Sequence, residues 1–183
     1  IAFTLWNLAQ IKNKNPRDNQ GETPLHLATR YDHIEVVKVI LENIESKNPS
    51  DKNVWTPMHI AAASNSYEIF RLLFMQTGNI NRGDRFGGTP LHCAAIYGCY
   101  DICKMILESE IIVDKNPKNH YGQTPLHVAA ENCHIEICQL FLTNGVKPNP
   151  TNNRGRTPSD LAMANYNMKI VNLFNENDIA WKW

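Results

Sequence analysis

The sequence lacks a long apolar run and an excess of either charge. Of its 183 residues, 43% are hydrophobic and 20% are charged, with 18 Lys and Arg against 18 Asp and Glu. No segment approaches the roughly 18 consecutive apolar residues that span a bilayer. A net charge of zero argues against a protein that binds nucleic acid by neutralising phosphates. We therefore expect a folded chain with no direct membrane insertion and no nucleic-acid partner.

Catalytic signatures and a secretion signal are missing as well. The chain has no Gly-x-x-x-x-Gly-Lys phosphate loop, no His-Glu-x-x-His, no Gly-x-Ser-x-Gly elbow and no Gly-x-Gly-x-x-Gly. Residues 1–11 contain no basic residue, so they do not have the pattern of a signal peptide, and we interpret the N-terminus as a cut end. These absences predict a chain that is not an enzyme, has no cofactor and comes from a longer protein.

What the sequence does contain is a four-residue string that returns at a fixed interval. Thr-Pro-Leu-His begins at residue 23, and versions of it begin at residues 56, 89, 124 and 157, in steps of 33, 33, 35 and 33 residues. An Asn lies eight residues before each of these threonines, and an alanine-containing stretch follows each box. The box positions that we expect to be structural are Thr23, Pro24, His26, Thr56, His59, Thr89, His92, Thr124, His127, Thr157 and Asp160.

Each repeat predicts a helix–turn–helix unit. Thr followed by Pro is typical of a helix start, because Thr caps a free N–H group and Pro fits the first helical position. A second stretch, such as Ile34 to Leu41, has apolar residues at helical spacing with charged residues between them. Two short helices cannot bury their apolar faces alone, so the units must stack.

A 33-residue period with Thr-Pro-Leu-His-x-Ala resembles the ankyrin repeat family. The resemblance implies an all-α solenoid of stacked helix–turn–helix units joined by β-turn or hairpin loops. It also implies that the box histidines hydrogen-bond between neighbouring repeats. They are not expected to bind metal, because equivalent positions of adjacent repeats lie about 8–10 Å apart, whereas zinc ligands lie about 2 Å from one point. We expect a partial repeat at 1–17, repeats at 18–50, 51–83, 84–118 and 119–151, and a cap-like C-terminal repeat at 152–183.

Three departures from the repeat pattern predict local differences. Val54 stands where the other loops have glycine, so we expect that loop to be strained or reshaped. Two extra residues around Ser109 to Val113 predict a bulge or a longer outer helix. Asp160 replaces the box histidine, which favours the helix start but removes the group that would reach a following repeat.

The cysteines are odd in number, which does not suit a disulfide framework and favours a reducing, cytoplasmic setting. They are Cys93, Cys99, Cys103, Cys133 and Cys138. Four of them form two pairs in neighbouring repeats, which leaves a zinc site open. However, Cys103 and Cys138 share the repeat position of Val37 and Val171, which favours packing in an apolar core.

The resemblance also implies a partner surface on the concave side, formed by loops and inner helices. We expect its residues to be Arg17, Gln20, Glu22, Arg30, Tyr31, Lys52, Trp55, Arg85, Phe86, Ile96, Tyr97, His120, Tyr121, Gln123, Glu131, Arg154 and Arg156. Aromatic residues and arginines are enriched at binding hot spots, and the only acids in this set are Glu22 and Glu131. The set predicts an extended acidic or phosphorylated partner segment with apolar anchors.

The sequence thus favours a non-catalytic protein–protein interaction scaffold, monomeric as a fragment of a larger intracellular protein. One alternative is a regulatory or substrate-presenting module attached to a catalytic or channel domain outside this chain. Another is a repeat domain that binds a small phosphorylated ligand or nucleotide. The cell-adhesion tripeptide Arg82-Gly83-Asp84 falls in an expected loop and is interpreted as coincidence.

Overall fold

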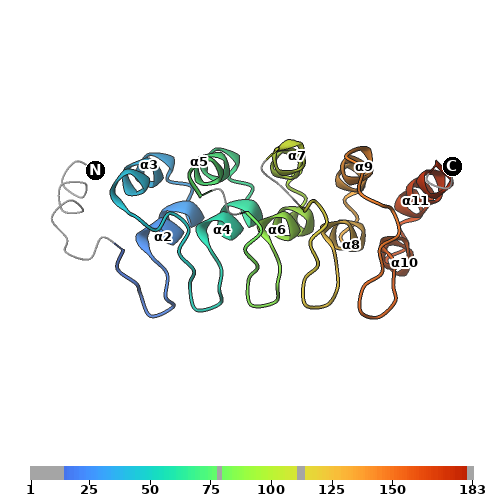
Figure 1. The fold of residues 1–183 in the computed structure, drawn as a ribbon, viewed down its shortest axis with the longest axis horizontal. Helices are drawn as coiled ribbons and strands as arrows, with labels where there is room; N and C mark the ends of the chain where they lie inside the picture. Colours follow the sequence, from blue (N-terminus) through green and yellow to red (C-terminus); the bar gives the residue numbers. More distant parts are fainter. Residues whose placement is uncertain (1–14, 78–79, 111–113, 181–183) are drawn as a thin grey trace. The chain divides into compact units, whose positions relative to one another are not determined.

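The computed structural model describes residues 15–77, 80–110 and 114–180, apart from the side chains of 178–180. The chain divides into two compact units, Ile1–Asn79 and Ile80–Trp183, and each is described by itself. The described part contains helices joined by turns and loops, and it contains no strand (Figure 1). The predicted all-α solenoid of helix–turn–helix units is confirmed. Residues 1–14, which include most of the predicted partial repeat, lie outside the described residues, as do residues 181–183.

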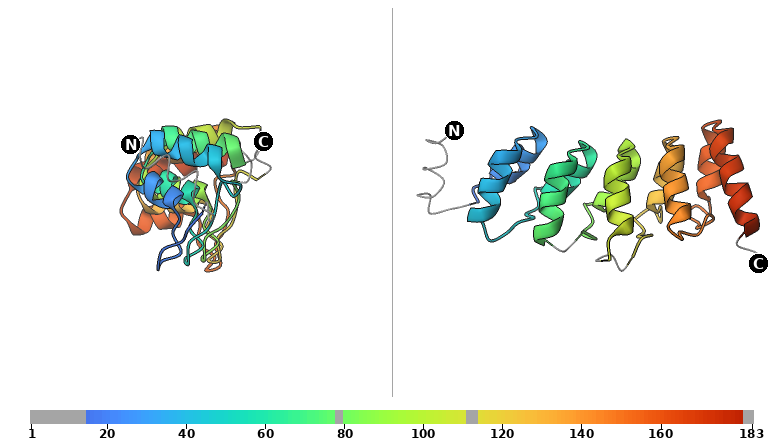
Figure 2. Two further views of the ribbon diagram at one scale, coloured as in Figure 1. Left: turned by 90° about the vertical axis from the view of Figure 1, so that its left-hand side faces the viewer. Right: turned by 90° about the horizontal axis from the view of Figure 1, so that it is seen from above.

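The helices come in pairs, an inner one that follows each Thr-Pro box and an outer one. Unit 1 contains α2 (Pro24–Arg30), α3 (Ile34–Asn43), α4 (Pro57–Ala63) and α5 (Tyr67–Thr77). Unit 2 contains α6 (Pro90–Tyr97), α7 (Tyr100–Glu108), α8 (Pro125–Glu131), α9 (Ile135–Thr143), α10 (Pro158–Ala164) and α11 (Met168–Ala180). Within each unit the outer helices lie side by side (Figure 2), and each pair packs on the next.

Every inner helix begins at its box threonine, with Pro at the first helical position. The third residue after each box threonine completes a capping box with it. For example, Nδ1 of His26 accepts the Thr23 N–H at 3.1 Å. Because Nδ1 is an acceptor, the ring hydrogen lies on Nε2, which donates to the carbonyl oxygen of Trp55 at 3.1 Å. The box histidine therefore caps its own helix and links it to the following repeat.

The core of each unit combines alanines and large side chains such as Leu25 and Met58 on the inner helices with large side chains on the outer helices. Ala28 and Ala61 are buried where the helices approach closely. Val37 and Leu41 of α3 are almost completely inaccessible, as is Phe141 of α9. Burial of such side chains contributes about 1.5–3 kcal/mol each, so stacking provides what a single helix pair lacks.

Val54 and the extra residues of the third repeat are the two places where the sequence predicts an altered loop. Val54 has φ 64°, close to the 71–78° of the glycines in the equivalent loops, so the loop keeps its shape and the valine carries the strain. The extra residues of the third repeat do not lengthen the outer helix, because α7 ends at Glu108 with Ser109 as its C-cap. Residues 111–113 lie outside the described part of the chain.

Candidate functional site

The hairpin loops are held by a recurring Asp or Asn five residues before each box threonine. Asp18 Oδ1, for instance, accepts the backbone N–H groups of Gln20 and Glu22 at 2.8 and 2.9 Å. The equivalent residues Asp51, Asp84, Asn119 and Asn152 make the same pair of bonds in their own loops. We did not predict this set from the sequence, although its spacing is as regular as that of the box. It fixes each loop so that its tip residues face outward.

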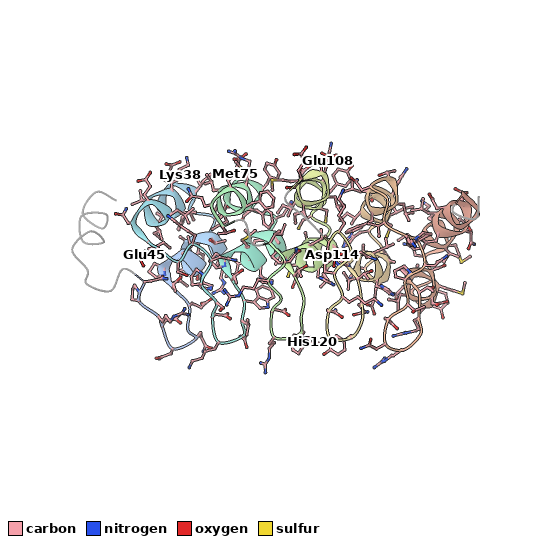
Figure 3. All side chains as sticks on the ribbon, viewed as in Figure 1. Lys38, Glu45, Met75, Glu108, Asp114 and His120 are labelled. Atoms are coloured by element: carbon pink, nitrogen blue, oxygen red, sulfur yellow. The ribbon has the colours of Figure 1, made fainter. Side chains whose placement is uncertain are left out.

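Neighbouring loops are joined by single backbone hydrogen bonds. In unit 1, Lys52 N donates to Gln20 O at 3.0 Å. In unit 2, His120 N donates to Phe86 O at 2.8 Å and Asn153 N donates to Tyr121 O at 3.0 Å. Figure 3 shows His120 at a loop tip, on the opposite side of unit 2 from Glu108 on its outer helix. The loops and inner helices thus form one face, which we call the inner face of each unit.

The predicted residues of unit 1 are largely engaged within the fold. Arg30 forms a two-point ion pair with Glu22, whose side chain is buried, and this hydrogen bonding raises the pKa of Arg30. Arg17 Nη1 donates to the carbonyl oxygens of Gly21 and Ser50, which ties two loops together. The basic character predicted for this part of the inner face is therefore partly neutralised, while Tyr31 offers an exposed apolar surface there.

Trp55 also has a role inside the fold. Its ring is half-buried and lies 6.1 Å from the ring of His59 between centroids. Its carbonyl oxygen accepts the hydrogen bond from His26 and its N–H group donates to Asp51. Trp55 therefore joins two repeats of unit 1. A partner could contact only the exposed part of its ring.

Unit 2 carries an exposed aromatic surface at the predicted positions. Phe86 and Tyr121 are 49% and 57% exposed and stack at 6.3 Å between ring centroids, and Arg85 lies over the Phe86 ring at 5.6 Å. Tyr97 is 58% exposed at the end of α6, next to the partly exposed Ile96. These side chains come from two loops and one inner helix and share the inner face.

A hollow of about 310 Å³ lies beside this aromatic surface, between the last two loops of unit 2. It is lined by Asn152, which holds the last loop, together with five of the predicted partner residues and Asn153. Its lining is Tyr121, Gln123, Glu131, Asn152, Asn153, Arg154 and Arg156. Gln123 Nε2 donates to the Glu131 carboxylate at 3.0 Å, so the one acid of the lining already has a partner.

A larger hollow of about 640 Å³ lies between the outer helices α7 and α9 of unit 2. None of the predicted partner residues lines it. Its lining is Gly98, Tyr100, His134, Glu136, Ile137, Gln139, Leu140 and Thr143. The His134 ring bonds through Nε2 to the carbonyl oxygen of Ile96 at 3.0 Å, so its role is to link two repeats.

The buried cysteine thiols and the Arg82-Gly83-Asp84 tripeptide have structural roles. Cys103 and Cys138 are buried, and burial raises the pKa of Cys138 to about 12 and that of Cys103 further still. Among the described residues, no group of three or more His, Cys, Asp and Glu is arranged to hold a metal ion. Asp84 of the tripeptide accepts the N–H groups of Phe86 and Gly88 at 2.8 Å, so its carboxylate is used by its own loop.

Comparison with known proteins identifies the repeat. A family model described as ankyrin repeats in three copies matches residues 3–84, 46–119 and 110–180. No curated protein matches the chain. None of the described helices combines the length and the apolar character needed to cross a membrane.

Proposed function

The chain belongs to the ankyrin repeat family, and from that premise we propose that it is a non-catalytic scaffold that binds an extended segment of a partner protein on its inner face. Ankyrin repeats are generally protein–protein interaction modules.

The observation that carries the proposal is the exposed aromatic surface of unit 2. Phe86, Tyr97 and Tyr121 expose about half of their side chains or more, although each residue's backbone lies in a loop or helix held by regular hydrogen bonds. Large aromatic side chains on a fixed backbone lose little conformational entropy on binding and are typical of interface hot spots.

The five cysteines are free thiols, which supports a reducing, cytoplasmic setting.

The partner segment is expected to carry acidic or phosphorylated residues beside its apolar anchors. Arg154 and Arg156 line the hollow next to Tyr121, and a guanidinium can bind a carboxylate or phosphate at two points. In unit 1 this preference has less support, because Arg30 is paired with Glu22.

A pull-down with matched variants tests the proposal. The bait is the chain, compared with Tyr97→Ala/Tyr121→Ala on the inner face and with Tyr67→Ala/Met75→Ala, which removes exposed apolar side chains from outer helix α5. Circular dichroism confirms that each variant is folded. We expect specific cytosolic proteins to be retained by the chain and by the outer-helix variant, and to be lost from the inner-face variant.

Loss from the outer-helix variant alone would overturn the inner-face proposal. Retention of no protein, together with a rise in thermal stability on adding a nucleotide, would favour the small-ligand alternative, because a ligand that binds only the folded state stabilises it.

A further inference from the structure

Two positions of the repeat face each other across the loop and the inner helix. They are the residue just before the box threonine and the residue seven after it. In the first repeat these are Glu22 and Arg30, which form an ion pair. In the fourth they are Gln123 and Glu131, which hydrogen-bond at 3.0 Å. Both pairs span eight residues, so the repeat geometry allows the contact where both side chains are polar.

The last repeat lacks such a pair, as do the second repeat, with Trp55 and Ala63, and the third, with Gly88 and Ile96. The residue before the last box threonine is Arg156, and the residue seven after is Ala164, which has no polar group to offer. Arg156 Nε is buried and has no hydrogen-bond partner within the described structure. Arg154 follows Tyr121 along the row of loop tips, since it occupies the same position in the next loop. Both arginines line the hollow.

The nearby acids only partly offset these arginines. Glu131 carries a formal negative charge, but its carboxylate accepts a hydrogen bond from the neutral Gln123. Asp160 accepts the N–H and O–H groups of Thr157 at 2.7 and 2.8 Å, and it forms no ion pair with Arg156. The charge of Arg156 contributes only after these bonds to the lowered pKa of Asp160. With two arginines against one glutamate, the lining of the hollow keeps a net positive charge that could pair with an oxyanion from outside.

We propose that this hollow is a subsite for an oxyanion side chain of the partner segment, a carboxylate or a phosphate, held by Arg154 and Arg156. The inference rests on the proposed function. It gives the two ends of the inner face of unit 2 different roles. Phe86, Ile96 and Tyr97 make apolar contacts, and the oxyanion contacts lie two repeats further along.

This arrangement sets a spacing within the partner segment. Neighbouring helices pack about 8–10 Å apart, so two repeats correspond to about 16–20 Å. An extended chain advances about 3.3 Å per residue. The oxyanion residue therefore lies about five or six positions from the apolar anchor.

Selection from a phage-displayed library of random 12-residue peptides tests the inference. Selected peptides should share an aromatic or aliphatic residue and an Asp or Glu at this spacing. The best peptide is then synthesised with Glu, Gln, Ser or phosphoserine at the acidic position, and its Kd is measured by fluorescence polarisation. The proteins are the original chain, Arg154→Ala/Arg156→Gln, and the control Arg71→Ala, which removes a guanidinium from outer helix α5.

We expect the Gln peptide to bind about tenfold more weakly than the Glu peptide to the original chain and to Arg71→Ala. On the double variant the difference should fall below about twofold. Phosphoserine that binds more tightly than Glu identifies a phosphate as the better ligand, and the reverse identifies a carboxylate. Equal affinities for the Glu and Gln peptides overturn the subsite but leave the scaffold intact. If no selected peptide is bound more weakly by Tyr97→Ala/Tyr121→Ala, both the subsite and the scaffold proposal are overturned.

Discussion

The guanidinium of Arg30 meets the carboxylate of Glu22 at two points, across the first hairpin loop and helix α2. The Nη1–Oε2 distance is 2.8 Å, and the Glu22 side chain is 8% exposed while that of Arg30 is 43% exposed. We expect Glu22→Gln to lower the free energy of unfolding by about 1 kcal/mol, because a partly buried two-point pair is lost but Arg30 can still reach water. Urea unfolding measures the change.

The control for this prediction is Glu35→Gln, which removes an exposed pair with Lys38 on helix α3. That change should alter stability by less than about 0.5 kcal/mol. Equal effects of the two substitutions would mean that the burial of Glu22 does not strengthen its ion pair.

Val54→Gly is expected to stabilise the chain by about 1 kcal/mol. A β-branched residue at φ 64° lies in the left-handed region, which costs L-residues about 1–2 kcal/mol and costs glycine nothing. Part of the gain is offset because glycine makes the unfolded chain more flexible. Thermal unfolding should give a Tm higher by about 2–4 °C.

The reverse change serves as its control. Gly122 has φ 71°, and a Cβ there would lie 2.7 Å from the backbone nitrogen of Asn153. Gly122→Val should therefore destabilise the chain clearly. A lower Tm for Val54→Gly would contradict the strain that its backbone angle implies.

In the native protein only Cys133 is expected to react rapidly with a thiol reagent such as DTNB at pH 8. Cys133 is exposed, whereas the other cysteines are buried, and burial raises the pKa of Cys93 to about 12. Native Cys133→Ser should show no fast phase, and all remaining thiols should react in guanidinium.

Cys103→Val should fold normally, because Val37 occupies the same repeat position and is fully buried.

The fold could be predicted from the sequence because its signals are local. Thr-Pro marks the start of each inner helix, and a period of 33 residues places each helix pair beside the next within each unit. Val54 could be identified as anomalous for the same reason: one position of a repeat differs from the others.

The electrostatics of the inner face could not be predicted in the same way. Counting arginines did not reveal that Arg30 is paired with Glu22, because the eight-residue contact follows no helical or strand period. Arg17 was likewise expected to face a partner, and its contacts with Gly21 and Ser50 exist only when two loops pack. Side-chain pairing across loops depends on three-dimensional geometry that a one-dimensional count does not contain.

The last prediction concerns the stability of the chain in mild acid. Burial is the largest influence on His127 and lowers its pKa, although its hydrogen bond to the Arg156 carbonyl opposes the shift. The same holds for His26 and its bond to Trp55. An imidazole in the unfolded chain titrates near 6.5. Between that value and the lower folded-state pKa, the unfolded chain binds a proton that the folded chain does not.

Stability should therefore be complete above about pH 6.5 and should decrease as the pH falls below it. The midpoint of urea unfolding, measured from pH 7.5 to pH 5, checks this. We expect His127→Gln to be less stable at pH 7.5, because it loses the Nε2 bond to Arg156 at 3.1 Å, and to show a weaker dependence on pH. His120→Gln at the exposed loop tip should leave the stability at pH 7.5 unchanged. A pH dependence that is the same in the original chain and in His127→Gln would mean that this buried box histidine does not cause it.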